Sequence, residues 1–291
     1  MSHKRRISEL LFERFHIRMT YDADRVLFEG RTAHQEAMVF RHRFLGKVLM
    51  LDGVTQLTDR DEFIYHEMMT HVPLFAHGNA RRVLIIGGGD CGIAKEVLKH
   101  TTIQHVEQVE IDPLVVELSR KFFSNISGSV FDDRRFHLVV ADGMDFIKTT
   151  DQRFDVIIVD STDPIGPGKV LFTPIFYTAC HKCLTAKGIL VTQNGVPFFQ
   201  RRELLKAVRA LDQTFAGATF YLASVPTYIG GHLAMGFASK SPTFSAPSSR
   251  TILRRYQNAG CFKTSYWTPE VHVASFVLPR FIAEILDEAR N

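Results

Sequence analysis

Apolar and polar residues follow two different patterns along this 291-residue chain. Up to residue 57 they mostly alternate, as they do in strands with one buried face. The predicted strands of this part lie near 25–29, 36–40 and 47–51. Asp52 and Gly53 follow the third strand, and this pair is typical of a tight hairpin turn. We therefore expect a small antiparallel β module over residues 1–57, followed by a larger domain over residues 58–291.

A helix is predicted where these two parts join. Thr58 begins a sequence that resembles a capping box, and apolar residues follow it with helical spacing. A proline inside a helix removes a hydrogen bond and clashes with the preceding turn. We therefore expect this helix to stop at Pro73.

From residue 82 onward, short continuous apolar runs alternate with stretches of helical periodicity. The runs predict strands near 83–86, 106–110, 136–140, 154–159 and 188–192. The stretches between and after them predict helices near 92–99, 113–123, 143–149, 174–184 and 201–211. Two more strands near 218–222 and 233–238 and two helices near 249–258 and 279–290 follow. This alternation is typical of an α/β fold with a mostly parallel sheet, which binds its ligands beyond the carboxyl ends of the strands.

The strand near 83–86 ends in three glycines and Asp90, which indicates a tight turn into a helix. Glycines have no Cβ, so backbone amides and the helix N-terminus can approach a ligand closely. Twenty residues after Asp90, the next strand ends in Glu110, where doubly wound folds carry the acid that binds ribose hydroxyls. The two features together favour a ligand that contains a ribose.

Acidic residues also follow the other predicted parallel strands, at Asp142, Asp160 and Asp163. Because the carboxyl ends of parallel strands meet at one edge of the sheet, we expect these acids to share a site with Asp90 and Glu110. So many carboxylates would repel phosphate, which argues against a dinucleotide and favours a cationic ligand. Prolines and glycines after Asp160 suit a loop that closes over a substrate.

Composition, charge and cysteine usage exclude several classes of protein. The chain is 45% hydrophobic and 23% charged, which is ordinary for a globular protein. No apolar run reaches the roughly 18 residues of a membrane span and no signal-peptide core follows Met1, so we expect a cytoplasmic protein with no membrane partner. The net charge of +4 comes from scattered cations, so no nucleic-acid partner is expected. Cys180 and Cys183 have the spacing of a metal or redox pair, but we interpret them as buried helix residues and expect no metal site.

Seven motifs together resemble the aminopropyltransferases, specifically bacterial spermidine synthase, over nearly the whole chain. They lie at 51–56, 61–69, 87–90, 109–112, 142–143, 160–167 and 226–228. The resemblance implies a methyltransferase-like (Rossmann-like) sheet with an N-terminal β module, in a homodimer or homotetramer. It also implies transfer of the aminopropyl group of decarboxylated S-adenosylmethionine to putrescine. The products would be spermidine and 5′-methylthioadenosine, and no cofactor beyond this co-substrate would be needed.

The resemblance assigns roles to individual residues. Asp160 matches the proton acceptor at the attacking amine. The matches for donor binding are Gln35, Gly87, Asp90, Glu110, Asp142, Gly143 and Pro167. The matches for binding putrescine are Tyr65, His66, Asp160, Asp163 and Tyr228. Glu110 would hold the ribose hydroxyls, and Asp90 would hold the ammonium of the aminopropyl arm.

Two positions depart from the family pattern. Cys91 stands where relatives commonly have glycine, and we expect it to fit if its backbone is helical. Lys169 stands where relatives commonly have glutamate, which leaves cadaverine, diaminopropane and spermidine open as acceptors. One alternative function is an S-adenosylmethionine-dependent methyltransferase, although Asp90 and Asp160 would repel the carboxylate of its cofactor. A second is a polyamine-binding or nucleoside-binding protein without catalysis, which would use the same acids.

Overall fold

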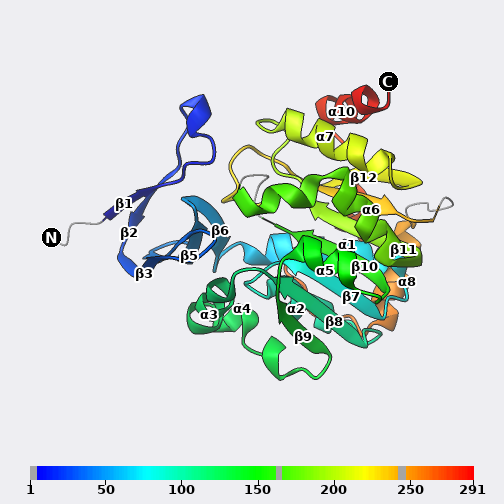
Figure 1. The fold of residues 1–291 in the computed structure, drawn as a ribbon, viewed down its shortest axis with the longest axis horizontal. Helices are drawn as coiled ribbons and strands as arrows, with labels where there is room; N and C mark the ends of the chain where they lie inside the picture. The colour runs from blue at the N-terminus through cyan, green and yellow to red at the C-terminus, as the bar shows by residue number, and fades with distance from the viewer. Residues whose placement is uncertain (1–4, 162–165, 242–246) are drawn as a thin grey trace.

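Three β-sheets organise the part of the chain that the structure describes (Figure 1). The computed structural model describes residues 5–161, 166–241 and 247–291. In the N-terminal module, β1 (Arg5–Ser8) pairs with β2 (Thr20–Ala23). The adjoining antiparallel sheet consists, in sequence order, of β3 (Arg25–Arg31), β4 (Glu36–His42), β5 (Gly46–Leu51) and β6 (Val54–Thr58). The antiparallel β module is therefore present, with one strand pair more than the sequence pattern indicated.

Both faces of this antiparallel sheet are used. The β5–β6 hairpin turns at Asp52 (φ 47°) and Gly53 (φ 73°), which is the left-handed geometry that an Asp-Gly turn provides. Val39 and Leu49 pack on one face against α3 and α4 of the α/β part, while Phe40 packs on the other against the β1–β2 pair. The module is thus attached to the rest of the chain through a continuous apolar contact.

A seven-stranded sheet with the order β12-β13-β11-β10-β7-β8-β9 forms the centre of the α/β part. Its parallel strands are β7 (Arg82–Gly87), β8 (His105–Glu110), β9 (Phe136–Val140), β10 (Phe154–Asp160) and β11 (Leu184–Gln193). At one edge, β13 (Leu233–Ser239) runs antiparallel to both β11 and β12 (Gly217–Ala223). The predicted mostly parallel α/β fold is confirmed.

Helices cover both faces of this sheet (Figure 1). The helices are α1 (Glu62–His77), α2 (Gly92–Leu98), α3 (Pro113–Phe122), α4 (Ser124–Ser127), α5 (Gly143–Thr149), α6 (Pro174–Cys183), α7 (Arg201–Asp212), α8 (Ser249–Asn258), α9 (Pro269–Ala274) and α10 (Arg280–Arg290). Three 3-10 helices are η1 (Glu13–Phe15), η2 (Val130–Asp132) and η3 (Gly166–Phe172). Ile85 of β7 packs towards α1 and α2, and Ile86 packs towards α5 and α6. This double coverage explains why the central strands are continuous apolar runs.

The predictions for α1 were wrong at both ends. The helix begins at Glu62, and Asp61 makes no capping hydrogen bond with its side chain. It continues through Pro73 and ends where Gly78 (φ 80°) donates its amide to the Leu74 carbonyl at 2.8 Å. Every residue from 64 to 76 is buried. Tertiary packing therefore outweighs the hydrogen bond that Pro73 cannot donate.

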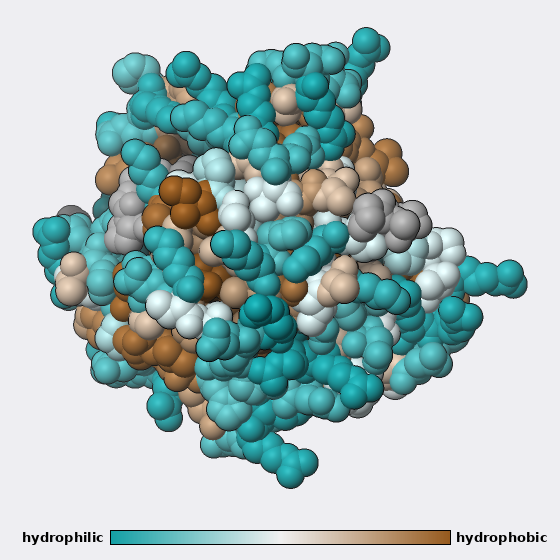
Figure 2. Space-filling model, turned by 45° about the vertical axis from the view of Figure 1, so that its right-hand side comes forward, coloured by the Kyte–Doolittle hydropathy of each residue, from teal (hydrophilic) through white to brown (hydrophobic). Residues whose placement is uncertain are grey.

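The cysteine pair and the surface can be compared with what the composition indicated. Cys180 and Cys183 are buried in α6 as predicted, where they pack in the core beneath the sheet. Among the residues that the structure describes, no helix is long and apolar enough to cross a membrane. On the face shown in Figure 2, hydrophilic residues predominate and apolar residues form small separate patches.

Candidate active site

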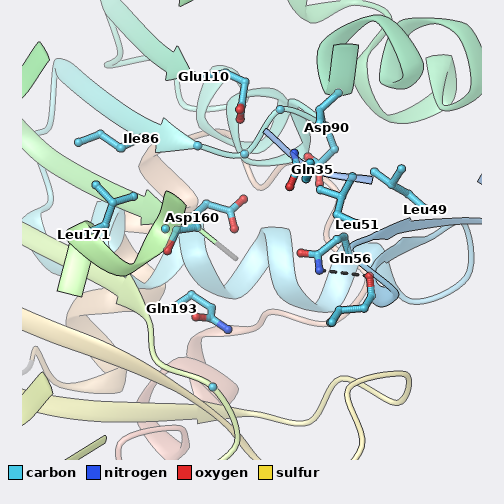
Figure 3. A pocket seen from close by; sticks show the side chains of 18 of the residues that line it. Gln35, Leu49, Leu51, Gln56, Ile86, Asp90, Glu110, Asp160, Leu171 and Gln193 are labelled. Atoms are coloured by element: carbon cyan, nitrogen blue, oxygen red, sulfur yellow. Dashed lines mark hydrogen bonds between the residues drawn. The ribbon is translucent and has the colours of Figure 1, made fainter. Parts of the chain in front are cut away.

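A cavity lies at the carboxyl ends of the parallel strands, between the α/β part and the N-terminal module (Figure 3). The predicted site residues on its wall are Gln35, Tyr65, Gly87, Asp90, Glu110, Asp142, Gly143, Asp160 and Tyr228. His66 is not on this wall. Asp163 lies outside the described residues, and Pro167 is described only as part of η3. The structure therefore brings together nine of the predicted residues at one place.

The turn after β7 depends on glycine. Gly87 has a φ of 84°, and a Cβ there would lie 2.0 Å from the carbonyl oxygen of Asp160. The amide of Gly88 (φ 66°) donates to that same oxygen at 3.0 Å. Gln108 of β8 supports the turn from the other side, because its Nε2 donates to the Gly87 carbonyl at 3.0 Å. Only residues without a Cβ allow the ends of β7 and β10 to approach so closely.

Cys91 does not have the helical backbone that we expected. Its φ is 62° and its ψ is 13°, so it lies in the left-handed region as the N-cap residue of α2. The turn requires this conformation, since the Cys91 amide donates back to the Gly88 carbonyl at 2.8 Å and the helix begins only at Gly92. The thiol is fully buried, and burial raises its pKa well above the usual range. Cys91, next to Asp90, therefore combines a strained backbone with a buried side chain.

Asp160 ends β10 and is paired with Tyr65 of α1. The Tyr65 hydroxyl donates to Oδ1 of Asp160 at 2.6 Å. Burial raises the pKa of Asp160 to about 7, and the nearby Asp90 carboxylate acts in the same direction, whereas Tyr65 and His66 oppose it. A carboxyl group with this pKa changes protonation state near neutral pH, as a general base should.

His66 lies behind Asp90 instead of facing the cavity. Its Nε2 is 3.3 Å from Oδ2 of Asp90 and its Nδ1 is 2.6 Å from Oε2 of Glu62. Burial alone would lower the pKa of this imidazole, but the two carboxylates hold it well above the usual value. The other oxygen of Asp90 accepts the Gly92 amide at 2.6 Å. The Asp90 carboxylate is thus held from two directions.

A second acidic group lies at the end of β8. Oε1 of Glu110 accepts the Asp112 amide at 2.8 Å, and burial raises the pKa of Glu110 to about 7. Gln35, from the loop between β3 and β4, donates to Oδ2 of Asp112 at 2.9 Å. Next to them, Asp142 caps α5 by accepting the Met144 amide at 2.7 Å. Gln35, Glu110 and Asp142 line the cavity, and the apolar side chains of Ile86 and Leu171 also line it (Figure 3).

Several cavity residues were missed by the sequence analysis. They are Glu9, Thr55, Gln56 and Gln193. Thr55 donates its hydroxyl to the buried Glu9 carboxylate at 2.5 Å, and the Tyr228 hydroxyl donates to the Gln56 carbonyl at 2.6 Å. Oε1 of Gln193 is buried without a partner among the described residues. Thr55 and Gln56 belong to the motif at 51–56, although that motif assigned them no role. No local sequence signal distinguishes Glu9 or Gln193 from other polar residues, so only the fold brings these two to the cavity.

The charge of the cavity wall is one-sided. Its ionisable carboxylates are Glu9, Asp90, Glu110, Asp142 and Asp160, and none of its described residues is a lysine or arginine. Lys169 is exposed and does not line the cavity, although both of its neighbours do. Among the described residues, no group of three or more His, Cys, Asp or Glu side chains could hold a metal ion. The geometry favours an organic cation with a nucleoside at one end.

The sequence of this chain is similar to those of known proteins. Residues 62–247 match the Spermine/spermidine synthase domain family and residues 11–59 match the Spermidine synthase tetramerisation domain family. A polyamine aminopropyltransferase of Pseudomonas syringae pv. tomato is 47% identical over 283 residues, which cover 97% of this chain and 98% of the relative. The corresponding enzyme of a Ruegeria species is 50% identical over 270 residues, covering 93% and 95%.

Solved structures show the same relationship. A crystal structure of spermidine synthase in complex with the transition-state analogue AdoDATO superposes with a TM-score of 0.91 at 36% identity, covering 99% of this chain and 96% of the other. Spermidine synthase from Thermotoga maritima gives a TM-score of 0.87 at 35% identity, with 99% and 95% coverage. The family resemblance and its fold are therefore confirmed. The chain belongs to the spermidine synthase family of polyamine aminopropyltransferases, a family of transferases.

Proposed function

We propose that this aminopropyltransferase uses decarboxylated S-adenosylmethionine as donor and putrescine as acceptor, and forms spermidine and 5′-methylthioadenosine. The main support for this proposal is the cavity wall, which has five carboxylates and no lysine or arginine among its described residues. Two cationic substrates repel one another, and such a wall offsets that repulsion. A spermidine synthase of the same fold has been solved in complex with the transition-state analogue AdoDATO, which supports the proposal.

The donor would bind along the β7 and β8 ends. Glu110 would accept hydrogen bonds from the ribose hydroxyls, with Gln35 beside it and Asp142 and Gly143 at the adenine. Asp90 would accept a hydrogen bond from the ammonium of the aminopropyl arm. In this arrangement His66 acts through Asp90 and touches neither substrate, because its two ring nitrogens face Glu62 and Asp90.

The acceptor would lie against a pair of tyrosine rings that contact each other. The centroids of Tyr65 and Tyr228 are 6.0 Å apart in a T-shaped arrangement. Their hydroxyls are engaged by Asp160 and by the Gln56 carbonyl, so the rings offer their apolar surfaces to the methylene chain. Asp163 and Pro167 remain predicted site residues.

The reaction is a direct displacement. The amine nitrogen forms a bond to the carbon next to the sulfonium, the C–S bond breaks with its electron pair going to sulfur, and the amine proton passes to Asp160 and then to water. For an ordinary aspartate, about 6.5 pKa units separate it from an amine of pKa near 10.4, which costs about 9 kcal/mol. With the pKa of Asp160 raised to about 7, the gap falls to roughly half of that, or about 5 kcal/mol.

The test is a reaction of the purified protein with decarboxylated S-adenosylmethionine and a panel of amines. The panel contains putrescine, cadaverine, diaminopropane and spermidine, and mass spectrometry follows methylthioadenosine and the polyamine products. We expect the highest kcat/KM with putrescine, since Lys169 does not reach the cavity wall. A clear preference for another amine would reject putrescine as the acceptor, and absence of methylthioadenosine with every amine would reject the reaction.

Asp160→Asn tests the proposed base. The variant should lose a factor of about 10²–10⁴ in kcat, because general-base catalysis contributes that much, and should still bind methylthioadenosine. Asp145→Asn is the matched control, since Asp145 is an exposed acid on α5 that does not line the cavity. Wild-type turnover in Asp160→Asn would remove Asp160 from this role.

We also propose that the protein assembles as a homodimer or homotetramer. The match of residues 11–59 to a tetramerisation domain family supports this assembly. Light scattering coupled to size-exclusion chromatography measures the mass directly, and a monomer at micromolar concentration would contradict it.

A further inference from the structure

Asp61 makes an unusual set of contacts for a residue that precedes a helix. Its side chain is 5% exposed and does not line the cavity. Oδ1 accepts the Thr58 hydroxyl at 2.6 Å. Oδ2 accepts both the amide and the hydroxyl of Thr227, at 2.9 and 2.7 Å, across 166 residues of sequence. The carboxylate thus joins the start of α1 to the loop between β12 and β13.

The two partners of this contact each adjoin a residue of the acceptor cavity. Tyr228 follows Thr227 directly, and Tyr65 lies one turn after Asp61 on α1. The position of Tyr228 relative to Tyr65 is therefore set within a few bonds of the Asp61–Thr227 contact. Beyond Tyr228 the loop contains Gly230 (φ 121°) and Gly231 (φ 95°), which are conformationally permissive residues.

Helix capping does not account for Asp61. A carboxylate at an N-cap normally accepts an amide from the first turn of its own helix, and Asp61 makes no such bond. A buried carboxylate is costly unless it is fully hydrogen-bonded, and the three donors here come from Thr58 and Thr227. The free energy of burying this charge is thus compensated only when the loop is in its observed place.

We propose that Asp61 and Thr227 form a latch that positions Tyr228 and thereby sets the affinity for the diamine, without contact to either substrate. This inference rests on the proposed function, because it assumes that the diamine lies against Tyr65 and Tyr228. Two hydrogen bonds from one residue to one carboxylate oxygen restrict both the backbone and the rotamer of Thr227. When the latch is loose, Tyr228 can adopt several positions, and diamine binding must then order it at a cost in free energy. A loose latch should therefore weaken acceptor binding.

Thr227→Val provides the most selective test, because it removes the hydroxyl bond and keeps the shape and the amide bond. With putrescine varied at saturating donor, the KM for putrescine should rise about tenfold, which corresponds to 1.4 kcal/mol. The kcat should change less than about threefold, and the Kd for methylthioadenosine, measured by calorimetry, less than about twofold. Asp61→Asn, which weakens all three bonds, should raise the KM further, by about 30-fold.

Two control variants separate positioning from general stability. Thr227→Ser restores the hydroxyl and should return the KM to within about threefold of wild type. Ser224→Ala alters an exposed side chain of the same loop and should leave the KM unchanged. A merely structural role would lower the melting temperature of Thr227→Val while its KM stayed at the wild-type value well below that temperature.

An unchanged KM in folded Thr227→Val, or an equal loss of methylthioadenosine affinity, would overturn the latch. The proposed reaction fails differently, through absence of turnover in the wild-type protein. If wild type shows no turnover, calorimetry can instead compare the affinity of wild type and Thr227→Val for putrescine, with methylthioadenosine bound to both proteins. Equal putrescine affinity in wild type and Thr227→Val would then reject the latch.

Discussion

Replacement of Cys91 by glycine and by alanine tests the strained turn beside Asp90. Cys91 is buried with a φ of 62°, in the left-handed region. In a helical residue, alanine is more stabilising than glycine by about 1 kcal/mol. At position 91 we expect the reverse order, with Cys91→Gly more stable than Cys91→Ala.

The magnitude follows from three terms. A left-handed backbone costs a residue with a Cβ about 1–2 kcal/mol, and glycine avoids this cost. Glycine loses more backbone entropy on folding, by about 0.5–1 kcal/mol. The balance favours glycine over alanine by roughly 1 kcal/mol. Cysteine carries the same backbone strain as alanine but buries a sulfur atom as well, so Cys91→Ala should be less stable than wild type by about 1 kcal/mol.

The assay is thermal unfolding at equal protein concentration without ligand, because oligomerisation and binding both shift the apparent stability. A difference of about 1 kcal/mol corresponds to roughly 2 °C for a protein of this size. Ala94→Gly, in the interior of α2, is the matched control and should be clearly destabilised, as is usual in a helix. If Cys91→Ala equalled or exceeded Cys91→Gly in stability, the backbone of residue 91 would not be left-handed in solution.

Two further predictions concern the charged groups. His66→Gln should weaken the binding of decarboxylated S-adenosylmethionine about tenfold, measured by calorimetry, because His66 supports Asp90. Binding of methylthioadenosine, which lacks the aminopropyl arm, should be unaffected. Equal losses of affinity for both ligands would contradict this support. The pKa of Asp160 is raised to about 7 in the folded protein, against about 3.9 in the unfolded chain. As pH rises, the unfolded chain therefore releases this proton first. Asp160 thus lowers the stability of the ligand-free protein as pH rises from about 4 to about 7. Asp160→Asn should therefore gain stability relative to wild type over that range in melting experiments, and a pH-independent difference would refute the raised pKa.

Short-range patterns in the sequence determined much of the architecture. The apolar runs of β7 to β11, the helices between them and the Asp52–Gly53 turn were all predicted at nearly their observed places. Asp90, Glu110, Asp142 and Asp160 reach one cavity, as expected for parallel strands that end at the same edge. These features could be predicted because a continuous apolar run or an Asp-Gly turn is recognised from a few neighbouring residues.

Only the tertiary structure decided the features that depend on distant contacts. Pro73 lies inside α1 because packing on all sides of that helix compensates a lost hydrogen bond. Glu9 and Gln56 reach the cavity because the N-terminal module packs against α3 and α4. Asp61 meets Thr227 across 166 residues. Local periodicity indicates which side of a helix or strand is buried, but not which other element packs against it. The contacts of Glu9, Gln56 and Asp61 depend on such long-range packing.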